Sequence, residues 1–101
     1  MEEEKILAAV FEAIDEVNAV LPPEGQIVKD RATVLFGEGG TLDSLGLVKM
    51  IVAVEGKLQE HFGTVVTLAN ERAMAREENP FRSVGSLAEY AAEVLKEEAR
   101  A

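Results

Sequence analysis

The chain has no cysteine, and its only histidine is His61. No disulfide framework and no thiolate metal site can form, and one histidine does not make a metal site by itself. Any thiol chemistry would therefore need a thiol from outside the chain. Aromatic residues are also scarce, four phenylalanines and one tyrosine among 101 residues, so a folded core must be mainly aliphatic.

Long hydrophobic runs and a secretion signal are also missing. No apolar run approaches the length that crosses a membrane, and the N-terminal residues 1–5 lack the basic start of a signal peptide. We therefore expect a cytoplasmic protein that does not insert into membranes. The length fits one domain, residues 1–101, and the hydrophobic share of 48% is enough for a folded core.

Positive charge is in short supply. Ten basic residues stand against 19 acidic ones, which gives a formal net charge of −9. Such a chain repels phosphate backbones and anionic lipid surfaces, which argues against nucleic acid as a partner. It favours protein partners with basic patches, through electrostatically steered encounter. We expect the chain itself to be a monomer.

Apolar residues at spacings of three and four predict two long helices in the first two thirds of the chain. One covers about residues 2–20 and ends before Pro22 and Pro23, which cannot continue a helix. The other covers residues 44–62, and Gly63 is its C-terminal stop. Its apolar positions are dense, so this helix should be central and touch more than one neighbour.

The last third of the chain predicts a short helix and a long one. The short helix covers about residues 68–76, with Thr67 as its cap, and the long one begins at the capping-box pattern Ser86-Leu87-Ala88-Glu89. The predicted class is therefore all-α, with three longer helices and one short helix.

A long connection, residues 22–42, separates the first two helices. Its apolar anchors predict that it is pinned to the core, with a turn of helix near residues 33–36, and the glycines of residues 37–40 predict a flexible hinge. His61 lies near a helix end, where we expect it to contact the last carbonyl groups.

The residues after this hinge are Asp43 and Ser44, at the start of the second predicted helix. Asp43 can accept hydrogen bonds from the free N–H groups of the first turn, so we interpret it as the N-cap. The Ser44 hydroxyl then lies at the positive end of the helix dipole, where a phosphate would be stabilised. The site suits a phosphoserine or a phosphodiester better than a buried structural serine.

The sequence Asp43-Ser44-Leu45 resembles the attachment motif of the acyl carrier proteins. Two further stretches are similar to that family, residues 47–55 and residues 80–90, and the three lie in the family's order. Together with the layout of the helices, the resemblance covers nearly all of the chain. It implies a four-helix bundle of the acyl-carrier type, with a long loop between the first and second helices.

The resemblance implies that Ser44 carries a 4′-phosphopantetheine arm, derived from coenzyme A, whose thiol holds acyl intermediates as thioesters. The implied partners are a phosphopantetheinyl transferase, which would contact Asp43 and Leu45, an acyl-loading ligase, and downstream acyl-transferring enzymes of fatty acid, polyketide or related lipid biosynthesis. The chain would be a non-catalytic carrier with no metal. Three positions match the family's acyl pocket, and core packing is their alternative role: Leu47, Met50 and Val54.

The second predicted helix departs from the family pattern, in which acidic residues are common on this helix. Glycine or lysine stands at matching positions where acids are common: Gly46, Lys49, Gly56 and Lys57. We infer a dedicated set of partner enzymes rather than the general fatty-acid enzymes.

Three alternatives stay open. The cargo could be aminoacyl or peptidyl, since such carriers share the fold and the serine. The chain could also be a helical interaction domain of carrier ancestry that is not modified. A hydrolase with Ser44 as nucleophile is disfavoured, because no histidine lies near Ser44 in the sequence and no Gly-x-Ser-x-Gly motif is present.

Overall fold

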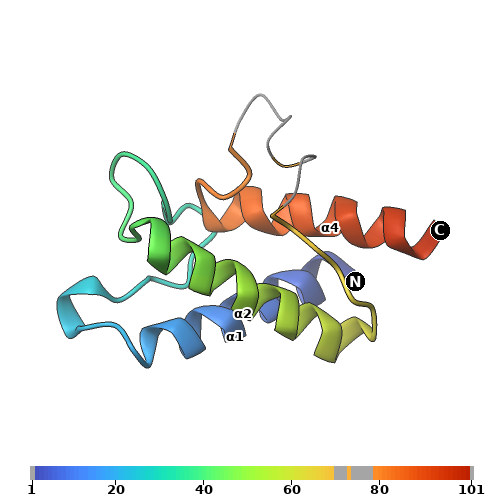
Figure 1. Cartoon of the computed structure of the whole chain (residues 1–101), viewed down its shortest axis with the longest axis horizontal. Helices are drawn as coiled ribbons and strands as arrows, with labels where there is room; N and C mark the ends of the chain where they lie inside the picture. Colours follow the sequence, from blue (N-terminus) through green and yellow to red (C-terminus); the bar gives the residue numbers. More distant parts are fainter. Residues whose placement is uncertain (1, 70–72, 74–78, 101) are drawn as a thin grey trace.

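The computed structural model describes residues 2–69, 73 and 79–100. These residues form three α-helices, α1 (Glu2–Asn18), α2 (Ser44–Phe62) and α4 (Val84–Arg100), together with one 3-10 turn, η1 (Pro23–Gly25). No strand occurs within the described ranges, so the all-α class is confirmed for them. Helix α1 packs against both α2 and α4 (Figure 1), and a long connection joins α1 to α2.

Helix α1 ends at Asn18, two residues earlier than predicted. The Asn18 side chain binds the backbone of Ile27 twice: its Nδ2 donates to the Ile27 carbonyl (2.9 Å) and its Oδ1 accepts from the Ile27 N–H (2.7 Å). Gln26 Nε2 also donates to the carbonyl of Asn18 (2.7 Å). The 3-10 turn η1 begins at Pro23, soon after α1 ends. The bonds of Gln26 and Ile27 then hold the chain that leaves η1 against the end of α1.

The core is mainly aliphatic, as the scarcity of aromatic residues predicts. It is formed by one apolar side of each helix together with anchors from the connections. The one tyrosine, Tyr90 on α4, is fully buried, and its hydroxyl donates to the backbone carbonyl of Leu68 (2.8 Å). Its ring meets Phe81 edge to face, with 6.0 Å between the ring centroids. Tyr90 therefore ties α4 to the segment that follows α2.

The turn of helix predicted near residues 33–36 is wrong. Val34 instead forms an antiparallel bridge with Ser83. The Leu35 N–H donates to the Arg82 carbonyl (2.6 Å), and the Val84 N–H donates to the carbonyl opposite it at residue 33 (3.0 Å). The expected pinning by apolar anchors is confirmed for Ile27 and Leu35, which are buried in the core, and backbone pairing with the segment before α4 adds to it.

Helix α4 begins at Val84, earlier than the capping box predicted at Ser86. Ser83 and Ser86 instead cap one another. The Ser83 hydroxyl accepts from the Ser86 N–H (3.1 Å), and the Ser86 hydroxyl accepts from the Ser83 N–H (3.0 Å). This is the reciprocal geometry of a capping box, with a second serine in the place that glutamate usually takes.

The predicted short helix over residues 68–76 lies largely outside the described residues. Leu68 and Ala69 are described and are not helical, so a helix cannot begin at Leu68. Ala73 is described, helical and buried.

Candidate functional site

Helix α2 runs from Ser44 to Phe62, the bounds predicted from the sequence. Asp43 is its N-cap, as predicted: its backbone is extended (φ −88°, ψ −175°), and its Oδ1 accepts from the Gly46 N–H at 2.7 Å. At the other end Gly63 adopts a left-handed conformation (φ 68°) and donates its N–H to the Gln59 carbonyl at 2.8 Å. Both ends of α2 are fixed by residues that the sequence identifies.

Ser44 is the first residue of α2, and it is exposed. The first intrahelical bond is donated by Leu47 to the Asp43 carbonyl (2.9 Å), and Asp43 Oδ1 takes the Gly46 N–H. The N–H groups of Ser44 and Leu45 therefore have no acceptor within the helix. No acidic residue lies in the first turn. The Ser44 hydroxyl thus stands beside two open backbone donors at the positive end of a 19-residue helix.

The other predicted site residues divide between surface and core. Leu45 is exposed beside Ser44, where a protein that approaches the serine would meet it. Met50 and Val54 are fully buried, and Leu47 is partly buried against the same core. Core packing, the alternative role for these three residues, is therefore what the structure describes, and an acyl chain could lie between them only if the core parts. Their pocket role stays a prediction.

The chain approaches Ser44 through a glycine loop, residues 37–40. Gly37 and Gly39 have positive φ angles of 99° and 83°, which glycine adopts without strain. Gly40 lies against backbone, because a Cβ atom there would stand 2.7 Å from the Leu35 carbonyl oxygen. The loop closes where Leu42 donates its N–H to that same Leu35 carbonyl (3.0 Å), two residues before Ser44.

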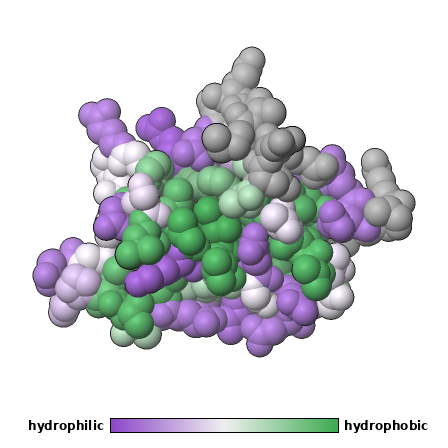
Figure 2. All heavy atoms as spheres, viewed as in Figure 1, coloured by the Kyte–Doolittle hydropathy of each residue, from purple (hydrophilic) through white to green (hydrophobic). Residues whose placement is uncertain are grey.

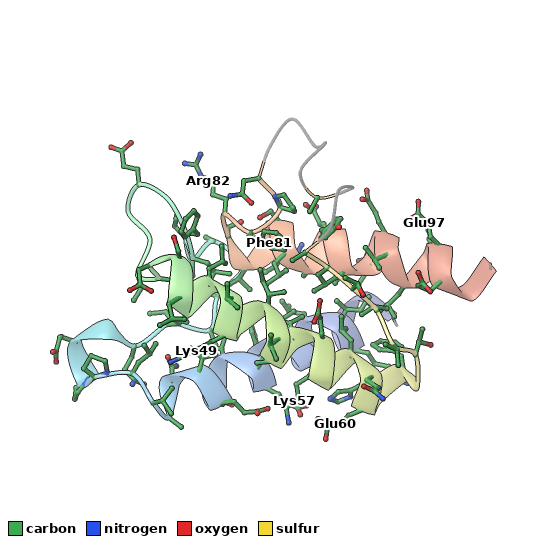
Figure 3. The ribbon with its side chains drawn as sticks, in the orientation of Figure 1. Lys49, Lys57, Glu60, Phe81, Arg82 and Glu97 are labelled. Atoms are coloured by element: carbon green, nitrogen blue, oxygen red, sulfur yellow. The ribbon has the colours of Figure 1, made fainter. Side chains whose placement is uncertain are left out.

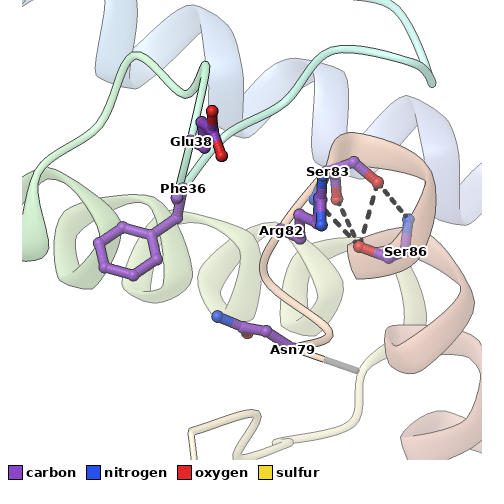
Figure 4. Close-up of a pocket in the computed structure, with 7 residues that line it drawn as sticks. Phe36, Glu38, Asn79, Arg82, Ser83 and Ser86 are labelled. Atoms are coloured by element: carbon purple, nitrogen blue, oxygen red, sulfur yellow. Dashed lines mark hydrogen bonds between the residues drawn. The ribbon is translucent and has the colours of Figure 1, made fainter. Parts of the chain in front are cut away.

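A pocket of about 570 Å³ lies between this loop and the start of α4 (Figure 4). Two charged side chains belong to it, Glu38 from the loop and Arg82 from the segment before α4. The residues that line it are Phe36, Gly37, Glu38, Asn79, Arg82, Ser83 and Ser86. Sequence reasoning missed this pocket, because the two segments are more than forty residues apart and neither carries a motif that predicts their pairing.

The opposite end of α2 carries a network of charges to α1 (Figure 3). Lys57 lies 2.9 Å from a carboxylate oxygen of Glu16 and 3.2 Å from one of Glu60. The hydrogen bond to Glu16, followed by that to Glu60, raises the pKa of Lys57 above its ordinary 10.5. His61 Nε2 lies 2.8 Å from Glu12 Oε2, so the predicted contact of His61 with the last helical carbonyls is wrong.

His61 is also far from Ser44. Seventeen residues of α2 separate the two, which is about 25 Å along the helix axis. The imidazole and the Ser44 hydroxyl therefore do not share a site.

Within residues 2–69, 73 and 79–100, no three potential ligands among histidine, cysteine, aspartate and glutamate are grouped to hold a metal ion. Every helix in the described part of the chain is too short or too polar to span a bilayer. Comparisons with protein-family profiles, curated proteins and solved structures found no match to the chain. The site is therefore defined by its own geometry: an exposed serine, an aspartate cap and an exposed leucine at the start of one helix.

Proposed function

We propose that the chain is a carrier protein of the acyl-carrier type, in which Ser44 is the attachment site of a 4′-phosphopantetheine arm. One observation carries the proposal: the Ser44 hydroxyl is exposed at the first position of α2, beside the open N–H groups of Ser44 and Leu45. A phosphodiester on that oxygen would lie next to two hydrogen-bond donors and the positive helix end. The residues present therefore fit the phosphate of the arm.

The arm would supply a thiol, which this cysteine-free chain lacks. The chain's own residues hold and present the attachment point. Asp43 fixes the start of α2 through its bond to the Gly46 N–H, and this fixes the direction of the neighbouring Ser44 side chain. The exposed Leu45 offers an apolar contact to the enzyme that modifies the serine. The expected cargo is an acyl group, held as a thioester and passed between partner enzymes.

The arrangement of the helices supports this proposal over a hydrolase. A serine nucleophile needs a base within hydrogen-bond reach, and the only histidine is about 25 Å away along α2. His61 is moreover engaged with Glu12 on α1. A hydroxyl at this position depends on the active site of another protein for its activation. The long connection before α2 and the small all-α fold agree with what the resemblance to acyl carrier proteins implies.

The test is the intact mass of the chain after incubation with coenzyme A, magnesium and a broad-specificity phosphopantetheinyl transferase. We expect a gain of one phosphopantetheine, which Ser44→Ala abolishes. Ser83→Ala is the matched control, because Ser83 also lies at the start of a helix but caps it. This variant should gain the group as the wild type does. No gain by the wild type, or a gain that survives in Ser44→Ala, would overturn the proposal.

A further inference from the structure

The outward side of α2 is apolar although the chain is strongly acidic. Leu45, Val48 and Val52 are 65%, 56% and 60% exposed, and their spacings of three, four and seven residues place them on one side of the helix. Gly56 continues this side, and open space surrounds it where a side chain would stand. Figure 2 shows apolar side chains gathered over this part of the molecule. We call Leu45, Val48 and Val52 the α2 stripe.

One positive charge interrupts this apolar surface. Lys49 follows Leu45 by four residues and precedes Val52 by three, so it borders the α2 stripe. It is exposed, and it is the only charged residue between positions 44 and 54. Among the ion pairs found in the described part of the chain, none involves Lys49. In contrast, Lys57 on the same helix has three carboxylate neighbours.

The α2 stripe lies next to Ser44. Val48 follows Ser44 by four residues, so the two side chains are neighbours on the helix surface, and Val52 lies about 12 Å from Ser44 along the axis. A protein interface of ordinary size covers about 800 Å² on each partner, which corresponds to a disc of roughly 16 Å radius. An enzyme that closes on the Ser44 hydroxyl with an interface of this size covers the whole stripe.

We propose that the enzyme which loads Ser44 docks on the α2 stripe through an apolar surface that carries a carboxylate opposite Lys49. This inference rests on the proposed carrier function and names the chemistry of the partner at the same site. Apolar contact is what the stripe offers, and the unpaired ammonium group of Lys49 determines the charge that complements it. The net charge of −9 would predict a basic partner surface, and Asp43 adds a carboxylate next to Ser44, but between positions 44 and 54 the only charge is the positive one of Lys49.

A second copy of the chain is a poorer occupant of this surface. In a two-fold dimer through the stripe, Lys49 of each copy would lie near Lys49 of the other, and like charges on opposite sides of an interface are destabilising. Two chains with a net charge of −9 also repel each other over longer range. Charge complementarity therefore favours a different protein as the source of the carboxylate opposite Lys49.

The experiment measures kcat/KM for loading of the chain by the broad-specificity phosphopantetheinyl transferase. The variants are Val48→Gln with Val52→Gln, and Lys49→Gln and Lys49→Glu singly. Val65→Gln is the matched control, because Val65 is 70% exposed but follows the far end of α2. Circular dichroism is used to check that each variant keeps its helices. We expect kcat/KM to fall about tenfold in the double variant, as for other central interface contacts, and to stay at the wild-type value in Val65→Gln.

Charge reversal and salt separate apolar docking from docking by a basic patch. Lys49→Glu should lower kcat/KM more than Lys49→Gln, because it places two carboxylates together. Raising the salt from about 50 mM to about 500 mM should change the wild-type value by less than about threefold, since apolar contacts are not screened. A rise in kcat/KM for Lys49→Glu would overturn the inference in favour of a basic partner, and a steep fall with salt would overturn docking that is mainly apolar.

The remaining outcomes separate the docking proposal from the carrier proposal. If the double variant is loaded as fast as the wild type, the docking proposal is overturned and the carrier proposal stands. Failure of the wild type to load would overturn both. Sedimentation gives an independent check. If the wild type is a dimer and the double variant is a monomer, the α2 stripe is the contact surface for a second copy of the chain, and the docking proposal is overturned.

Discussion

Removal of the Asp43 carboxylate should destabilise the chain by an amount that its contacts define. Asp43→Ala deletes the acceptor of the 2.7 Å bond from the Gly46 N–H, and loss of such a cap costs about 1 kcal/mol. The variant also removes a negative charge from the positive helix end, which adds about 0.3–1 kcal/mol. Because the site is exposed, water can reach the freed N–H group, which keeps the total below about 2 kcal/mol.

Thermal unfolding followed by circular dichroism measures this loss. For a domain of this size, each kcal/mol should lower Tm by about 4–8 °C. Asp43→Asn keeps the acceptor and loses only the charge, so it should lie between Asp43→Ala and the wild type. Asp30→Ala is the matched control: Asp30 Oδ1 accepts a similar bond from the Ala32 N–H (2.8 Å), but in a loop that begins no helix. A Tm for Asp43→Ala equal to that of the wild type, or a larger loss in Asp30→Ala, would refute the assignment of Asp43 as a stabilising cap.

Three further predictions concern the frame behind the site. Tyr90→Phe should lower the free energy of unfolding in urea by about 1–3 kcal/mol, because the Leu68 carbonyl loses its buried donor; an unchanged midpoint would contradict this. Gly40→Ala should destabilise the chain in the same assay by about 1–3 kcal/mol, because the added Cβ meets backbone atoms. Gly56→Ala should instead stabilise it by about 0.5–1 kcal/mol, because this glycine lies within α2 and open space surrounds it. Equal effects of the two substitutions would refute the reasoning. The raised pKa of Lys57 means that its ion pairs stabilise the fold below pH 10.5, and this contribution is lost as the pH rises through the folded-state pKa. Lys57→Met should therefore show a smaller fall in Tm above pH 10.5 than the wild type. An identical fall in the two proteins would count against the ion-pair network.

The sequence predicts the bounds of α2 well because both of its ends carry local signals, but among the described helices the central one is α1, which packs against both others. Asp43 at the start and Gly63 at the stop act through their own backbone neighbours, so no distant residue is needed to place them. Ser44 is therefore placed at the first helical position from sequence alone. The exposure of Leu45, Val48 and Val52 could not be predicted in the same way, because apolar residues surround α2 on nearly every side in the sequence and only packing decides which face is left outside.

Where the prediction fails, a partner distant in the sequence or an ambiguous cap is responsible. Residues 33–36 have no helix because Val34 pairs with Ser83, and nothing local indicates that pairing. At the start of α4 two serines stand three residues apart, and either could begin a helix. The structure uses Ser83 as the cap and Ser86 as its reciprocal partner. The contact of His61 with Glu12 cannot be predicted from neighbouring residues either, because Glu12 lies on another helix.

The pairing of Val34 with Ser83 divides the connection between α1 and α2 into separate loops. After this anchor, residues 37–41 form a short loop, in which the Gly40 N–H donates to the Gly37 carbonyl (2.9 Å), before Leu42 rejoins the Leu35 carbonyl. The entropy of closing a loop grows with the logarithm of its length, and each doubling costs only about 0.6 kcal/mol. The fold thus separates the part that must stay constant from a short segment, residues 37–39, whose length can vary at low cost, and that segment ends five residues before the serine in the chain.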